Sequence, residues 1–141
     1  MQVKICGIRS IEAAEAAVKY GANYIGFIFV SGSKREIGTQ ECLEITNNIK
    51  NKFPESKVKS VGLFGNQDLS EIDGILDETD LDMIQLCGDR DFDVSIPSIR
   101  QIRIRESDSS DQILDYVQKA LLVHNYVVLD SYHDKKLGGT G

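Results

Sequence analysis

The sequence predicts an α/β fold organised around a parallel sheet of about six strands. Short apolar runs, rich in β-branched and aromatic residues, alternate with longer segments of helical period, which is typical of repeated βα units. The chain has 141 residues, 41% of them apolar, and we expect residues 1–141 to form a single domain. This length is short for a closed eight-stranded β/α barrel, which needs at least about 200 residues.

The first two units have clear boundaries. Strand 3–6 leads to a helix that Ser10 caps and Gly21 ends, with apolar residues at helical spacing between them. The run 24–29 is apolar throughout, as expected for a strand buried on both faces. After a polar loop, Thr39 begins a second helix with one apolar face.

The third and fourth units differ in their helices. Strand 60–64 is followed by Asp68-x-x-Glu71, a capping-box pattern, and then by apolar residues at helical spacing. Strand 83–86 is followed by residues 88–98, which contain a proline and little helical periodicity. We therefore expect the fourth helix to be short or missing.

The last units complete the alternation. Strand 99–104 precedes a helix capped by Ser109-x-x-Gln112, and strand 126–129 ends at Asp130. Two architectures accept this order, an open doubly wound sheet and the first six units of a (β/α)8 barrel, and periodicity alone does not choose between them. In both, functional groups gather at the carboxyl ends of the strands.

Composition excludes several classes of function. The 16 Lys and Arg against 22 Asp and Glu leave a net charge of −6, which argues against nucleic-acid and anionic-membrane partners. No apolar run approaches the roughly 18 residues of a membrane span, and the first residues lack a signal-peptide core, so we expect a cytoplasmic protein. The three cysteines are widely spaced without a C-x-x-C motif, so neither a disulfide framework nor a metal site is expected.

Two residues at strand ends are candidates for proton transfer. Cys6 ends the first strand and precedes Gly7, where its thiol is available as a base or nucleophile; the alternative is a small apolar residue of the core. Asp130 directly follows the sixth strand and has no helix to cap, so it is a candidate acid.

Other candidates are anion binders. Arg35 lies in the polar loop after the second strand, where its guanidinium suits a carboxylate or is simply solvated. Gly138 and Gly139 belong to a glycine-rich end that can wrap an anion with backbone N–H groups or act as a mobile lid, although ordinary turn chemistry is the more common explanation of such a segment. The two histidines, His124 and His133, are given no role.

Segments spread along the whole chain resemble the phosphoribosylanthranilate isomerase family, whose members are (β/α)8 barrels. They occur in the family's order: VKICGI (3–8), GANYIGFIF (21–29), SKR (33–35), VGLF (61–64) with Asn66, IQL (84–86) with Gly88, and LDS (129–131) with GGTG (138–141). Six ordered matches are far more specific than any single one.

The resemblance implies an Amadori rearrangement of N-(5-phosphoribosyl)anthranilate in tryptophan biosynthesis, with a small phosphosugar as substrate and neither metal nor organic cofactor. In the family's pattern Asp130 matches the general acid, Cys6 the general base, and Arg35 the residue that holds the anthranilate carboxylate. A thiol base and a carboxylic acid need opposite environments near neutral pH, because ordinary thiols are protonated there and ordinary carboxyls are ionised.

The sequence departs from the family pattern in two places. Cys87 stands where the family has a histidine, so we expect a substrate-binding position without its imidazole. The chain also ends about 60 residues before a complete barrel, without the last two β/α units whose loops commonly hold phosphate in this fold. We therefore expect an incomplete barrel with little activity by itself, and open edges that favour a homo-oligomer or a complementing C-terminal fragment.

Two alternatives remain at this point. One is a non-catalytic α/β module that serves binding or structure. The other is a different sugar-phosphate barrel enzyme, which variants of Cys6 and Asp130 would distinguish.

Overall fold

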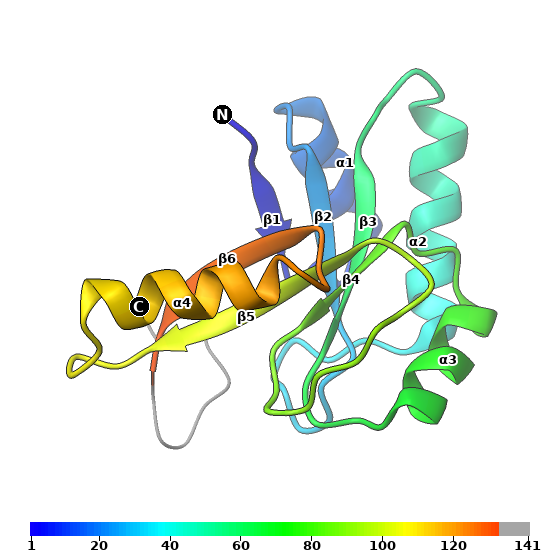
Figure 1. The fold of residues 1–141 in the computed structure, drawn as a ribbon. Coiled ribbons are helices and arrows are strands. Elements are labelled where there is room, and N and C mark those ends of the chain that lie inside the picture. Colours follow the sequence, from blue (N-terminus) through cyan, green and yellow to red (C-terminus); the bar gives the residue numbers. More distant parts are fainter. Residues whose placement is uncertain (133–141) are drawn as a thin grey trace.

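The computed structural model describes residues 1–132, which form one six-stranded parallel sheet and four helices (Figure 1). The strands are β1 (Lys4–Cys6), β2 (Tyr24–Ile28), β3 (Lys59–Phe64), β4 (Met83–Leu86), β5 (Ser98–Ile104) and β6 (Tyr126–Ser131). The helices are α1 (Ile11–Lys19), α2 (Thr39–Lys52), α3 (Leu69–Glu78) and α4 (Ser110–Ala120).

The strand order decides between the two predicted architectures. Every strand pairs in parallel with the next one along the chain, in the order β1-β2-β3-β4-β5-β6. A doubly wound sheet reverses its order at a switch point, whereas a barrel adds each strand beside the last. The predicted incomplete (β/α)8 barrel of about six strands is therefore confirmed as a half-barrel, and the open doubly wound sheet was the wrong alternative.

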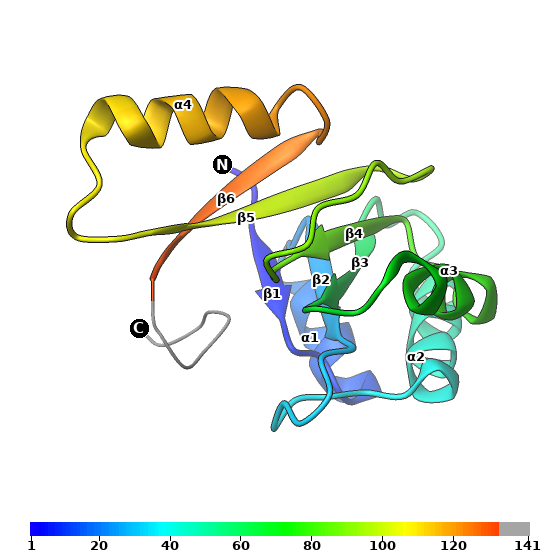
Figure 2. The same cartoon turned by 60° about the horizontal axis from the view of Figure 1, so that its bottom comes forward.

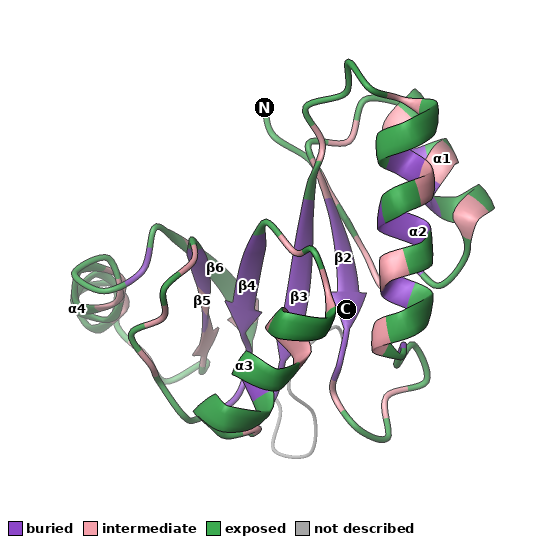
Figure 3. Ribbon diagram, turned by 90° about the vertical axis from the view of Figure 1, so that its right-hand side faces the viewer, coloured by how far each residue is buried: buried purple, intermediate pink, exposed green. Residues whose placement is uncertain are grey.

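Two apolar clusters cover the two faces of this sheet. The larger lies between the strands and α1, α2 and α3, and includes Phe27, Phe64 and Ile72, each almost fully buried. The smaller lies on the concave inner face and includes Val61, Met83 and the thiol of Cys87, as expected for a filled barrel interior. Figure 3 shows the burial concentrated in the central strands and the sheet-facing sides of the helices.

The predicted helix caps are confirmed. The Ser10 hydroxyl accepts a hydrogen bond from Ala13 N at 3.2 Å, and Asp68 and Ser109 each form a full capping box. The helix predicted at Thr39 begins there, with Gly38 as its N-cap. No helix lies between β4 and β5 in this fully described part of the chain, as the weak periodicity indicated.

The last unit lies apart from the rest. Helix α4 runs alongside β5 and β6, away from the other three helices (Figure 2), and contains no buried residue. Large apolar side chains here remain more than a third exposed: Leu114, Tyr116, Leu121, Leu122, Val123, Tyr126, Val128 and Leu129. None of the helices within residues 1–132 has the length and apolarity needed to cross a membrane.

Candidate active site

The Cys6 thiol lies at the carboxyl end of β1, on the concave side of the sheet. Cys6 is half-buried and packs against the inner apolar cluster. Its register partner on β2 is Gly26, and a Cβ atom placed there would lie 3.1 Å from Cys6 Sγ. A glycine at this position therefore provides the room in which the thiol sits.

The loop after β2 folds back onto the end of β1. Gly7 has a φ of +81°, a conformation that favours glycine, and a Cβ there would lie 2.6 Å from the Arg35 guanidinium. Arg35 Nη1 donates a hydrogen bond to the Cys6 carbonyl at 2.9 Å. The structure thus brings Arg35 directly against the backbone of Cys6 and Gly7, although the sequence separates them by a complete βα unit.

A chain of polar side chains crosses the concave interior to Asp130. Lys4 Nζ donates to Gln85 Oε1, and Gln85 Nε2 donates to Gln101 Oε1 at 3.1 Å. Gln101 Nε2 then donates to Asp130 Oδ2 at 3.1 Å. Both glutamines are buried, with exposed fractions of 4% and 6%. A lysine ammonium group can only donate, so Gln85 Oε1 must be the atom that faces Lys4. This contact fixes which amide atom of Gln85, and then of Gln101, donates and which accepts.

Asp130 is half-buried near the carboxyl end of β6. Its two carboxyl oxygens have different partners, since Oδ1 accepts from Ser131 N at 2.8 Å and Oδ2 from Gln101. The carboxyl is therefore held in one orientation. Cys6 is on β1 and Asp130 is on β6, at opposite edges of the half-barrel sheet. The Cys6 side chain packs against the inner apolar cluster, and the Asp130 carboxyl accepts from Gln101.

Cys87 immediately follows β4 and belongs to the inner cluster. Gln85 Nε2 lies 3.4 Å from its Sγ, and burial raises the pKa of this thiol to about 11. The side chain is therefore a neutral thiol near neutral pH, and it adds no charge to the mouth of the site. Gly138 and Gly139, the other predicted substrate-binding residues, lie outside the described residues.

Comparison with known proteins identifies the family. The family model described as N-(5'-phosphoribosyl)anthranilate (PRA) isomerase matches residues 3–141. The chain belongs to the PRA isomerase family.

Named relatives agree with this assignment. The N-(5'-phosphoribosyl)anthranilate isomerases of Crocosphaera subtropica and Bacillus cereus (strain G9842) are 35% and 34% identical over the whole of this chain, which covers 67% and 65% of their lengths. The crystal structure of the Thermotoga maritima enzyme superposes with a TM-score of 0.77 at 26% identity, covering 99% of this chain and 65% of that one. The chain thus spans about two thirds of the PRA isomerases that it matches.

The sequence analysis missed Lys4, Gln85 and Gln101, although a signal for them was present. Lys4 and Gln85 are polar residues at inward positions of otherwise apolar strands, and Gln101 is an uncharged polar residue on β5. A polar side chain at an inward position requires a partner. Two of these residues lie in segments that carry the resemblance to PRA isomerases. Their hydrogen-bond partners lie on other strands. The sequence pattern therefore identifies these residues as unusual but does not predict which residues they contact.

His124, for which no role was predicted, is part of a buried structural cluster at the amino ends of β5 and β6. Its Nδ1 lies 2.9 Å from Ser98 Oγ, and its Nε2 lies 2.7 Å from the Asp91 carboxylate. Asn125 Oδ1 accepts from Ser98 N at 2.9 Å. These contacts join the loops at the end of the sheet opposite to Cys6 and Asp130, where a barrel of the PRA isomerase type keeps its stabilising contacts.

We expect one of the three thiols to react much faster than the others. Burial raises the pKa of Cys42 to about 12 and that of Cys87 to about 11, so at pH 8 the thiolate is only about one part in a thousand at Cys87 and less at Cys42. Alkylation at pH 8 followed by peptide mass spectrometry should modify Cys6 first. Labelling of Cys87 should rise as the pH approaches 11, and equal rates for all three thiols in the folded chain would contradict the burial described here.

Proposed function

We propose that the protein is an N-(5'-phosphoribosyl)anthranilate isomerase, which forms 1-(2-carboxyphenylamino)-1-deoxyribulose 5-phosphate by acid–base catalysis. Membership of the family supports this activity. The observation that carries the assignment of roles is the hydrogen-bonded chain that orients the Asp130 carboxyl toward the same concave interior in which the Cys6 thiol lies.

Each step of the rearrangement has a matching group. Asp130, as the general acid, protonates the furanose oxygen, so that the C1–O bond breaks and a C1–N iminium forms. Cys6, as the general base, takes the proton from C2, and the resulting enolamine tautomerises to the ketone. No atoms are gained or lost, and the chemistry calls for neither metal nor organic cofactor.

Binding is assigned to residues around the same mouth. Arg35 holds the anthranilate carboxylate, because its guanidinium is positioned against Cys6 and Gly7 and still offers further N–H donors. Cys87 contributes a neutral wall, and the glycines at positions 138 and 139 supply backbone N–H groups. A cytoplasmic location and a small phosphosugar substrate complete the proposal.

The isomerase proposal is tested on two proteins, the product of the complete reading frame and residues 1–141 alone. We expect the first to convert N-(5'-phosphoribosyl)anthranilate to the deoxyribulose product, followed by chromatography. We expect residues 1–141 to turn over poorly, because the loops that commonly bind phosphate in this fold belong to later β/α units. A folded product of the complete reading frame that forms no product would overturn the activity.

The exposed apolar surface of the last unit favours a second role in association. Leu122 and Leu129 are 85% and 53% exposed, and β6 pairs with a neighbour on one side only. Such an edge suits a second copy of the chain or a complementing C-terminal segment. Sedimentation of residues 1–141, without further β/α units to cover this surface, tests self-association. A monomer at all concentrations would exclude it.

A further inference from the structure

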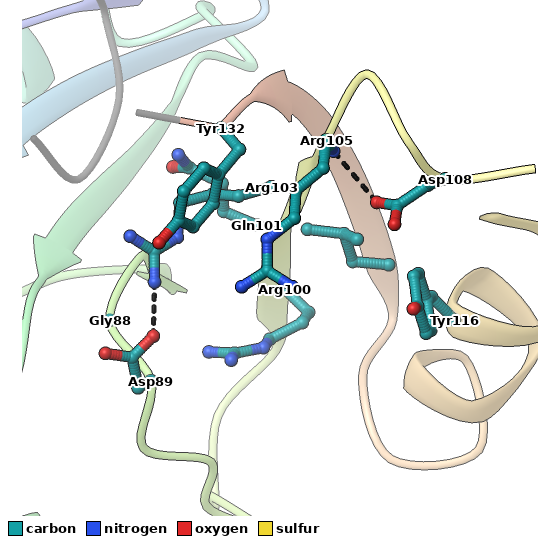
Figure 4. A pocket seen from close by; sticks show the side chains of 10 residues that line it. Gly88, Asp89, Arg100, Gln101, Arg103, Arg105, Asp108, Tyr116 and Tyr132 are labelled. Carbon is teal, nitrogen blue, oxygen red and sulfur yellow. Dashed lines mark hydrogen bonds and ion pairs between the residues drawn. The ribbon is translucent and has the colours of Figure 1, made fainter. Parts of the chain in front are cut away.

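A pocket of about 240 Å³ at the carboxyl ends of β5 and β6 has not been assigned any of the roles above. Figure 4 shows three arginine side chains from β5 and the residue after it gathered around the pocket, beside a tyrosine that follows β6. The side chains that matter here are Asp89, Arg100, Arg103, Arg105, Tyr116 and Tyr132. Such a concentration of cations is unexpected in a chain with a net charge of −6.

Arg103 is a largely buried cation with a replaceable partner. Its side chain is only 17% exposed, whereas the Asp89 carboxylate that pairs with it is 76% exposed. The backbone of Asp89 is held, because its N–H donates to Asn66 Oδ1 at 3.0 Å, so displacing the carboxylate requires only a rotation of the exposed Asp89 side chain. An anionic group from solution can therefore replace the Asp89 carboxylate. It would then bind Arg103 at the position that this carboxylate now occupies.

Arg105 brings a second guanidinium to the same place. Its Cζ lies 4.5 Å from the centroid of the Tyr132 ring, and that of Arg103 lies 5.5 Å from the same centroid. None of the salt bridges between residues 1–132 involves Arg105. Stacking on one aromatic ring holds both guanidinium groups in place while leaving N–H donors for a ligand.

Arg100 is fixed by the backbone instead of by a carboxylate. Its Nη1 donates to the carbonyl of Arg90 at 3.1 Å and lies 3.5 Å from that of Leu86. The pocket thus contains three guanidinium groups against the carboxylates of Asp89 and Asp108. Its lining carries a positive charge before any ligand binds, and the side chains are positioned in advance.

This chemistry suits a small phosphate ester. Planar guanidinium groups bind oxyanions through paired N–H donors, and several converging cations favour a dianionic phosphate over a carboxylate with one charge. The acidic rim and the net negative charge of the chain disfavour a nucleic-acid polyanion. We propose that this pocket binds the phosphoryl group of a small phosphomonoester, with Arg103 and Arg105 as its main ligands and Asp89 displaced from Arg103.

The proposal concerns binding and stands apart from isomerase turnover. Gln101 lines the pocket and donates to Asp130, so a bound phosphomonoester would lie next to the proposed acid. Failure of the isomerase assay with retained phosphate binding would overturn only the proposed activity. Loss of phosphate binding with retained turnover would overturn only this site.

The test is a titration of the 141-residue chain with ribose 5-phosphate and with inorganic phosphate, followed by NMR of the backbone amides and arginine Nε–H groups. We expect saturable shifts at Arg103 and Arg105 with both phosphates, and none with ribose or benzoate. Arg103→Met should weaken binding roughly 10- to 100-fold, the cost of a lost charge-assisted contact. Asp89→Asn should strengthen it a few-fold, because it removes the competing carboxylate.

Matched controls separate a built site from general electrostatics. Lys50 and Asp80 form another ion pair, half or more exposed, between α2 and the loop that joins α3 to β4. Lys50→Met and Asp80→Asn make the same charge changes as the two test variants and should leave affinity unchanged. If Arg103→Met does not fold, Arg105→Met replaces it. Absence of saturable binding, weaker binding by Asp89→Asn, or equal effects of the control variants would overturn the proposal.

Discussion

Replacing Asp130 by Asn is expected to lower the kcat of the isomerase by about 10²- to 10⁴-fold. The amide cannot deliver a proton to the furanose oxygen, and its NH2 group would face the donating Nε2 of Gln101, which now points at Oδ2. Cys6→Ser is expected to cost a similar factor, because a serine hydroxyl stays protonated where a thiol can ionise. Both variants are measured in the product of the complete reading frame.

The matched control for these two variants is Cys42→Ser. Cys42 is a fully buried thiol on α2, in the cluster between the sheet and the helices, so its loss should affect stability without a comparable effect on kcat. KM should change only a few-fold in Asp130→Asn and Cys6→Ser, since neither group is assigned to binding. Retention of more than about a tenth of wild-type turnover by either variant would refute its catalytic role.

Phe64→Ala is expected to lower the free energy of unfolding by about 3–5 kcal/mol. Phe64 ends β3, is fully buried, and stacks on Phe29 with ring centroids 5.5 Å apart and an interplanar angle of 12°. Its removal leaves a cavity between the sheet and the helices that rigid strands on either side cannot close. Urea denaturation of the 141-residue chain, followed by circular dichroism, measures the loss.

The control for this stability prediction is Leu122→Ala. Leu122 is 85% exposed, so its truncation should change the free energy of unfolding by less than about 0.5 kcal/mol. If Phe64→Ala is already unfolded without urea, the milder Phe64→Leu reports the same site. A loss below about 1 kcal/mol for Phe64→Ala would mean that the packing around this ring is not as described.

The parts of the fold that the sequence predicted well depend on local patterns. Ser10, Asp68 and Ser109 cap their helices because a side-chain oxygen meets an N–H group only three residues away. The missing helix between β4 and β5 was likewise visible in the lack of periodicity. Strand ends were predicted less closely, and β5 begins at Ser98, one residue early, because Ser98 pairs with Ile84 of β4 and its carbonyl accepts from Asn125 N at 3.0 Å.

The parts that sequence reasoning missed depend on contacts between distant strands. Lys4 and Gln85 are 81 residues apart, and only the curvature of the half-barrel brings them together. Cys6 and Asp130 were identified because strand ends are recognisable, and their catalytic roles remain predictions. Arg103 was missed because a charged residue near the end of a strand usually indicates solvent, whereas its side chain is mostly buried.

The contact at Gly88 limits how this chain can vary. A Cβ atom there would lie 2.2 Å from the backbone oxygen of Gly65, and Asn66 Oδ1 accepts from Asp89 N at 3.0 Å just beside it. The loops after β3 and β4 therefore cross main chain against main chain. Any larger residue would push these loops apart and move Asp89 away from Arg103, so only glycine fits at position 88 without a shift of the backbone.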